Sequence, residues 1–121
     1  MYLYPDFRYL NVLEMKTRNG GEILVEKVKI GWKEYEIKLL EPQQTLKTGS
    51  GECYGEIFYD EKVIHINKAY DAEQQEATLI HEVLHGIENM YSLELGEETV
   101  TRLAQAIYTF LKDNNLEIKH S

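Results

Sequence analysis

The chain is organised around residues 78–85, which read TLIHEVLH and end in the pattern His-Glu-x-x-His. Residues four apart in an α-helix lie one above the other on the same face, so His81 and His85 can offer two imidazoles to one metal ion. Glu82 then points to one side of that pair. The pattern fixes only three residues in five, and it gains weight only from the sequence around it.

The whole chain has the size and composition of one folded domain. Its 121 residues are too few for two domains, 43% of them are hydrophobic and only two are proline. We therefore expect a single domain over residues 1–121. The formal net charge of −8 disfavours nucleic-acid phosphates as partners, and the sequence holds no basic patch that would override it.

Two further features predict where the protein works. The first apolar stretch contains Asp6 and Arg8, so it is neither a signal peptide nor a membrane span. Cys53 is the single cysteine and cannot form an internal disulfide, which fits a reducing compartment. We expect a cytoplasmic protein without a membrane partner.

Two hairpins are predicted ahead of the motif. Apolar and charged residues alternate over 22–30 and 35–39, on either side of a turn that begins at Gly31. A second pair of alternating segments, 54–59 and 62–67, is joined by a short acidic turn. Each pair predicts two antiparallel strands.

The remaining segments are less regular. Residues 1–21 form an N-terminal extension, which reads as a helix beginning near Pro5 or nearly as well as a strand. Residues 41–51 have the composition of a loop. Residues 116–121 are a short polar tail that we expect to be flexible.

Two helices follow the hairpins. Asp71 with Gln74 three residues later resembles a capping box and predicts the start of the first helix. The two histidines lie at the border of its apolar side, which we assign to Ala77, Ile80, Leu84, Ile87 and Tyr91. Gly96 fits the N-cap of the second helix, which ends at 113–115. Its predicted buried stripe is Val100, Leu103, Ala104, Ile107 and Leu111.

Together these elements predict an α+β fold. It is a small antiparallel or mixed sheet of about four strands, packed on the motif helix and on the glutamate-bearing helix that follows.

A catalytic zinc ion takes three protein ligands, so the histidine pair needs a third. The helical step of about 100° puts Glu97 about 70° from the centre of the second stripe, and Glu98 about 170° away. We therefore predict that His81, His85 and Glu97 bind Zn²⁺. Glu98 is expected to face water and stays an alternative.

The position of Glu97 constrains the first helix. Glu97 lies twelve residues after His85, and a straight helix reaching Tyr91 would carry the chain about 9 Å past that histidine. We predict that the helix ends near Glu88 or Asn89, or that the two helices cross steeply.

Two carboxylates near the pair have candidate roles. Glu82 is the candidate general base, because a carboxylate beside zinc can take a proton from a water whose pKa the metal has lowered. Glu88 lies one turn beyond His85 and can accept a hydrogen bond from its imidazole. The alternative for Glu88 is a solvated carboxylate.

The predicted strands and motif helix, followed by residues 95–104 with the sequence LGEETVTRLA, resemble the ImmA/IrrE-type metallopeptidases, and look closest to their short phage or prophage forms. The resemblance covers roughly residues 27–115. It implies a zincin-like domain in which His81, His85 and Glu97 bind zinc and Glu82 is the catalytic base. Family members commonly carry Glu-x-Glu-Ala-Asn-x-Phe-Ala on the glutamate helix. This chain departs from that pattern at Thr99 and Thr101, which keeps Glu98 open.

The resemblance implies a zinc-dependent peptidase that cleaves a protein or peptide substrate, such as one specific regulatory repressor. The alternative is a catalytically silent zinc-binding module that binds a protein partner. In zinc peptidases of this build an edge strand binds the substrate in extended form, and chain order assigns that strand to residues 54–59. Gly55 would allow close approach of the substrate or mark a bulge.

The other candidate residues carry weaker signals. Peptide deformylases combine a cysteine with this motif, but the residues around Cys53 lack the rest of their pattern, and a lone cysteine is more often a small buried residue. His65 reads as a sheet residue and His120 as a tail residue. Tyr54 and Tyr91 are candidate oxyanion donors between which the sequence does not choose. It also leaves the oligomeric state open.

Overall fold

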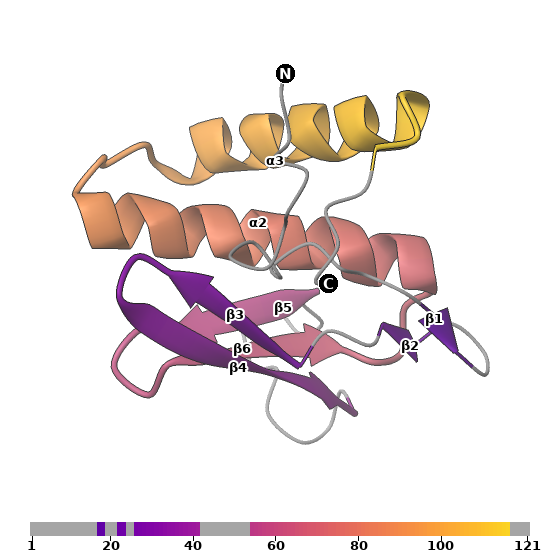
Figure 1. Cartoon of the computed structure of the whole chain (residues 1–121), viewed down its shortest axis with the longest axis horizontal. Coiled ribbons are helices and arrows are strands. Elements are labelled where there is room, and N and C mark those ends of the chain that lie inside the picture. Colours follow the sequence, from indigo (N-terminus) through magenta and orange to yellow (C-terminus); the bar gives the residue numbers. More distant parts are fainter. Residues whose placement is uncertain (1–16, 19–21, 24–25, 42–53, 117–121) are drawn as a thin grey trace.

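The computed structural model describes residues 17–18, 22–23, 26–41 and 54–116 of the chain (Figure 1). The elements in chain order are β1 (Thr17–Arg18), β2 (Glu22–Ile23), β3 (Lys27–Ile30), β4 (Lys33–Leu40), β5 (Gly55–Phe58), β6 (Val63–Asn67), α2 (Ala72–Tyr91) and α3 (Glu97–Asp113).

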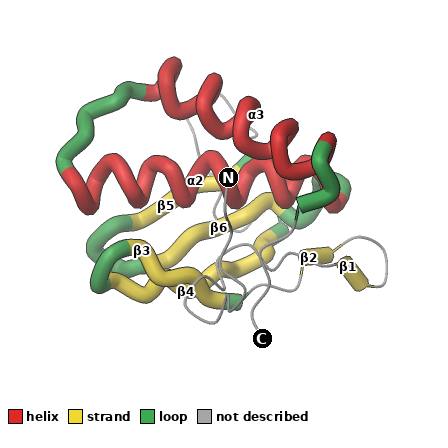
Figure 2. Tube along the Cα trace, turned by 45° about the horizontal axis from the view of Figure 1, so that its top comes forward, coloured by secondary structure: helices red, strands yellow, loops and turns green. Residues whose placement is uncertain are grey.

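The elements stack in three layers, with the main sheet covered by α2 and α2 covered by α3 (Figures 1 and 2). The sheet has four strands in the order β3-β4-β6-β5. β4 and β6 run parallel, whereas the two outer pairs are antiparallel, so the sheet is mixed. The predicted α+β class, with a small sheet and two helices, is confirmed.

The first predicted hairpin is present in a shorter form. β3 pairs with β4 so that Val28 faces Tyr35, and the inward side chains of both strands are buried. The alternation of apolar and charged residues therefore predicted the buried face of these two strands correctly. The expectation of one strand over 22–30 is wrong, because Ile23 lies in β2, which pairs with β1 in a separate two-stranded sheet.

The second predicted hairpin is confirmed, with β5 antiparallel to β6. Its register is continuous from Gly55 to Phe58, so the bulge considered at Gly55 is absent. A Cβ atom at this glycine would lie 2.7 Å from the His65 carbonyl oxygen and 2.7 Å from Cγ2 of Thr78. Glycine is therefore required here by the close approach of α2 to the sheet.

Helix α2 begins as predicted, because the Asp71 carboxylate accepts a hydrogen bond from the Gln74 amide at 2.9 Å. Its predicted single apolar stripe is wrong. Leu79 and Val83 pack on the sheet, whereas Ile80 and Leu84 pack on α3. A helix between two layers buries two faces. Tyr91, which was predicted to belong to the apolar side, lies outside both faces and is exposed.

Helix α3 begins after Gly96, as predicted, and buries Val100, Ala104 and Leu111 against α2. The prediction that Leu103 is buried is wrong, since its side chain is exposed. Leu116, placed in the flexible tail, instead packs on the α2–α3 core, and its amide donates to the Leu111 carbonyl at 2.9 Å.

Several predictions fall on residues outside the described part of the chain. They are the helix or strand within 1–16, most of the loop at 41–51, Cys53 and the tail from 117 to 121. Within the described part, neither helix combines the length and apolar character that crossing a bilayer requires.

Gly86 provides a test of the packing between α2 and the sheet. A Cβ atom there would lie 2.6 Å from Cδ1 of Ile30. Gly86→Ala should therefore lower the free energy of unfolding by about 1–2 kcal/mol in urea denaturation, although alanine is the better helix former. Ile30→Val removes Cδ1, so in that background the same substitution should cost less than half as much. An equal cost in both backgrounds would contradict this packing.

Candidate metal centre

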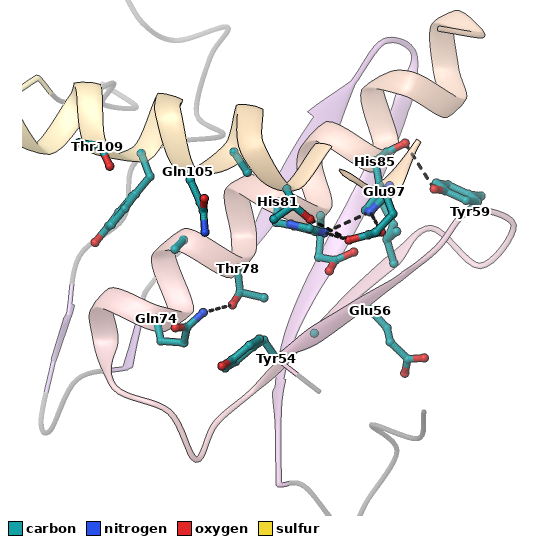
Figure 3. Close-up of a pocket in the computed structure, with 17 residues that line it drawn as sticks. Tyr54, Glu56, Tyr59, Gln74, Thr78, His81, His85, Glu97, Gln105 and Thr109 are labelled. Carbon is teal, nitrogen blue, oxygen red and sulfur yellow. Dashed lines mark hydrogen bonds and ion pairs between the residues drawn. The ribbon is translucent and has the colours of Figure 1, made fainter. Parts of the chain in front are cut away.

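Three predicted ligands meet at one point. His81 Nε2 lies 3.2 Å from His85 Nε2, and the Glu97 carboxylate lies 3.0 Å from the first and 2.8 Å from the second (Figure 3). Ligand atoms that surround a tetrahedral zinc ion at about 2.0–2.1 Å are about 3.3 Å apart. Two imidazole nitrogens and one carboxylate are also a donor set that zinc commonly takes. The three residues therefore fit a zinc ion.

The pKa values of the two imidazoles shift in opposite directions. Burial lowers the pKa of His81, a shift that the nearby Glu97 carboxylate opposes without reversing. Burial also acts to lower the pKa of His85, but its hydrogen bond to Glu88 and the surrounding carboxylates together raise it. Burial thus dominates the shift at His81, whereas the neighbouring carboxylates dominate it at His85.

The path from His85 to Glu97 differs from the prediction. α2 runs through to Tyr91, so the expectation that it ends near Glu88 or Asn89 is wrong. The alternative of a steep crossing is wrong too, because α3 runs back alongside α2 (Figure 1). The helix stops at Ser92 in the left-handed conformation, with φ 56°. Residues 93–96 then lead back toward the histidines, with a second left-handed residue at Glu94 (φ 53°) and a positive φ of 89° at Gly96.

Glu88 holds this returning segment in place. One of its carboxylate oxygens accepts hydrogen bonds from the amides of Leu95 at 2.8 Å and Gly96 at 3.2 Å. The other lies 2.8 Å from Nδ1 of His85. A carboxylate on Nδ1 favours the tautomer whose Nε2 carries no proton, which leaves that atom free to bind a metal. The hydrogen-bonding role considered for Glu88 is therefore the one observed.

The geometry also separates the two candidate glutamates. Glu98 points away from the histidines and pairs with Arg102 at 3.2 Å on the surface. Glu97 is the glutamate that reaches them: its Oε1 faces His85, and its Oε2 faces His81. The Oε2 atom also accepts a hydrogen bond from the Thr101 hydroxyl at 3.1 Å. Thr101, which departs from the family pattern, thus helps to orient the candidate ligand.

Glu82 is buried, with 7% of its surface exposed, and it lines the same cleft as the two histidines. Burial raises the pKa of its carboxyl group to about 7. A carboxyl group in this range can both accept and release a proton near neutral pH, as general base catalysis requires.

The site opens into a cleft of about 850 Å³ between β5, α2 and α3. In Figure 3 the histidines and Glu97 lie at one end, and Tyr54 and Gln74 lie at the other. Gln105 and Thr109 line it from α3. An open cleft next to three ligands is typical of a catalytic zinc site, because structural sites are closed by a fourth protein ligand.

The cleft contains residues that the sequence did not single out. Tyr59 lines it beside the candidate metal ligands, and its hydroxyl donates to the His85 carbonyl oxygen at 3.4 Å. Tyr108 lines it from α3 and donates to Glu76 at 3.0 Å. Of the two predicted oxyanion donors, Tyr54 lines the cleft and Tyr91 does not. The sequence could have indicated Tyr108, because its spacing from Ala104 and Thr101 places all three residues on one side of α3.

The remaining histidine that the structure describes, His65, lies in β6 as predicted, with its ring 5.0 Å from that of Phe58. It is not part of the cluster of His81, His85 and Glu97.

Comparisons of the chain with family models, with curated proteins and with solved structures gave no match. The ImmA/IrrE resemblance therefore stays a prediction from the motifs, and we infer function from the geometry of the site.

Removal of each glutamate tests the choice of third ligand. Glu97→Ala should lower zinc affinity by about 100-fold or more, because a ligand is lost, whereas Glu98→Ala should leave it unchanged. Competition with a chromophoric chelator measures both affinities. Metal loss in the Glu98 variant alone would show that the wrong glutamate is assigned.

Glu88→Gln tests the support of His85. If the amide oxygen keeps its bonds to residues 95 and 96, the amide nitrogen faces Nδ1 and favours the tautomer with a proton on Nε2. Zinc affinity should then fall about 10- to 100-fold, with the helices still folded by circular dichroism. Glu94→Gln, an exposed change in the same connection, is the matched control. Equal affinities in the two variants would exclude this role.

Proposed function

We propose that this protein is a zinc-dependent metallopeptidase that hydrolyses peptide bonds. The observation that carries the proposal is a buried Glu82 carboxyl group in the same open cleft as the convergent side chains of His81, His85 and Glu97. A zinc ion that only stabilises the fold has no need of an adjacent proton acceptor or of an open cleft.

Zinc bound by these three residues would supply a Lewis acid that polarises the substrate carbonyl group and acidifies water. Glu82 accepts a proton from the attacking water while the oxygen of that water bonds to the carbonyl carbon. When the carbon–nitrogen bond breaks, Glu82 returns that proton to the departing amine. Glu88 keeps His85 in the required tautomer, and Thr101 orients Glu97.

Strand β5 offers the main chain that would position the substrate. It ends the four-stranded sheet, and the Tyr54 carbonyl oxygen accepts from the Asn67 amide at 2.8 Å, toward β6. In an antiparallel pair, alternate residues turn their amides the other way, so Gly55 and Ile57 direct theirs to the side on which no described strand pairs with β5. An extended peptide can pair with these groups as an added strand.

The motif resemblance supports a narrower version of the proposal. A short ImmA/IrrE-like enzyme would cleave one regulatory protein, such as a repressor, rather than digest peptides in general.

Glu82→Gln tests the proposal directly. The variant should bind zinc and keep the wild-type circular dichroism spectrum, but its rate of peptide cleavage should fall about 10²- to 10⁴-fold, because proton transfer is lost. Mass spectrometry of a peptide mixture measures cleavage, and Glu98→Gln is a control with the same loss of charge. A zinc-loaded wild-type protein that cleaves no peptide or protein would favour a silent zinc-binding module instead. Cleavage that survives in the Glu82→Gln variant would contradict the role of Glu82 as the general base.

A further inference from the structure

A second, smaller cavity continues the cleft at the end away from the metal ligands. Its volume is about 360 Å³, and it shares four lining residues with the main cleft: Tyr54, Gln74, Ala77 and Tyr108. The other lining residues are Tyr70, Asp71 and Glu73. A substrate lying in the cleft can therefore extend a side chain into this cavity.

Three tyrosine rings line the cavity. The rings of Tyr54 and Tyr70 contact each other, with centroids 4.6 Å apart and planes tilted by 56°. Tyr108 faces them from α3 as a lining residue of both cavities. Aromatic faces carry negative potential and attract cations, and they also pack against the aliphatic stem of lysine or arginine.

Among the residues that the structure describes, the charged side chains lining the cavity are both acidic. Asp71 and Glu73 line it, whereas Lys112, which lies 3.7 Å from Glu76, lines neither cavity. Burial raises the pKa of Tyr108, and the charges of Glu76, Glu73 and Asp71 raise it further. Three acidic side chains therefore act on the tyrosine hydroxyl. The Lys112 ammonium lies 5.8 Å from the centroid of the Tyr108 ring.

We propose that this cavity is a specificity subsite that binds a lysine or arginine side chain of the substrate, an inference that rests on the proposed peptidase function. The aliphatic stem lies among the tyrosine rings, and the positive head group meets Asp71 and Glu73. The net charge of −8 would also attract a basic protein substrate over longer distances.

The geometry limits where the basic residue lies in the substrate. Gln74 precedes Glu82 by eight residues on α2, which is about 12 Å along the helix axis. An extended peptide advances about 3.3 Å per residue. The recognised residue is thus within about four positions of the bond that is cleaved.

The first experiment uses zinc-loaded wild-type protein and a peptide library made by digestion after glutamate, which preserves internal lysine and arginine. Mass spectrometry should show about tenfold enrichment of these residues at one position within four of the cleavage site, which corresponds to one good cation–aromatic contact with charge support. Cleavage without such enrichment would overturn the subsite and leave the peptidase proposal intact.

The variant Asp71→Asn/Glu73→Gln removes both charges from the cavity. Asparagine caps a helix as well as aspartate does, so α2 should stay folded. Enrichment of lysine and arginine should fall at least threefold, with cleavage of neutral peptides retained. The control Glu94→Gln/Glu98→Gln removes two charges from exposed sites and should keep the enrichment. An equal fall in both double variants would overturn the local role of Asp71 and Glu73.

A binding measurement separates this proposal from the peptidase proposal. ¹⁵N-labelled protein is titrated with acetyl-arginine amide and with acetyl-norleucine amide, which has a similar stem but no charge. The amide shifts of Tyr54, Gln74 and Tyr108 should change with both probes. The arginine probe should produce a given change at a concentration at least several-fold lower than the norleucine probe requires. This result would support the subsite even if no peptide is cleaved, and equal or absent responses would overturn it.

Discussion

The carboxylate of Glu88 ties together the parts on which the site depends. One oxygen accepts hydrogen bonds from the amides of Leu95 and Gly96, and the other forms the hydrogen bond that orients His85. The first contact fixes the segment that returns along α2, and the second fixes a candidate ligand on α2 itself. A single side chain thus places Glu97 beside the histidine that it must meet, across twelve residues of chain. Farther along α3, the packing of its apolar side on α2 and the hydrogen bond from Tyr108 to Glu76 set the position of the helix.

The three-layer arrangement explains why the candidate catalytic residues lie where they do. The sheet and α3 bury two faces of α2, through Leu79 and Leu84 among others. The side of α2 between those faces carries His81, Glu82 and His85, and it opens into the cleft. Burial on both sides holds the helix rigidly, as a preorganised site requires. It also removes Glu82 from water, which raises the pKa of its carboxyl group.

Sequence periodicity predicted the two main hairpins, the two helices, their N-caps and the convergence of the histidine pair with Glu97. These features depend on local chemistry or on the repeat of one element. The sequence did not predict that α2 buries two faces, nor the exposure of Leu103, because both depend on how layers stack. The sequence also predicted that α2 ends too early. The estimate of the distance from His85 to Glu97 did not allow for a connection that turns back along the helix. The reversal depends on Glu88 and on Ser92 in the left-handed conformation, and periodicity describes neither.

The central claim is that His81, His85 and Glu97 hold a zinc ion beside Glu82. Anomalous diffraction from crystals of the purified protein, recorded on both sides of the zinc absorption edge, tests it most directly. A zinc ion at this site predicts one strong peak about 2.0–2.1 Å from Nε2 of both histidines and from a Glu97 oxygen. A peak bound to Glu98 or to other residues, or no zinc peak after incubation with the metal, would contradict it.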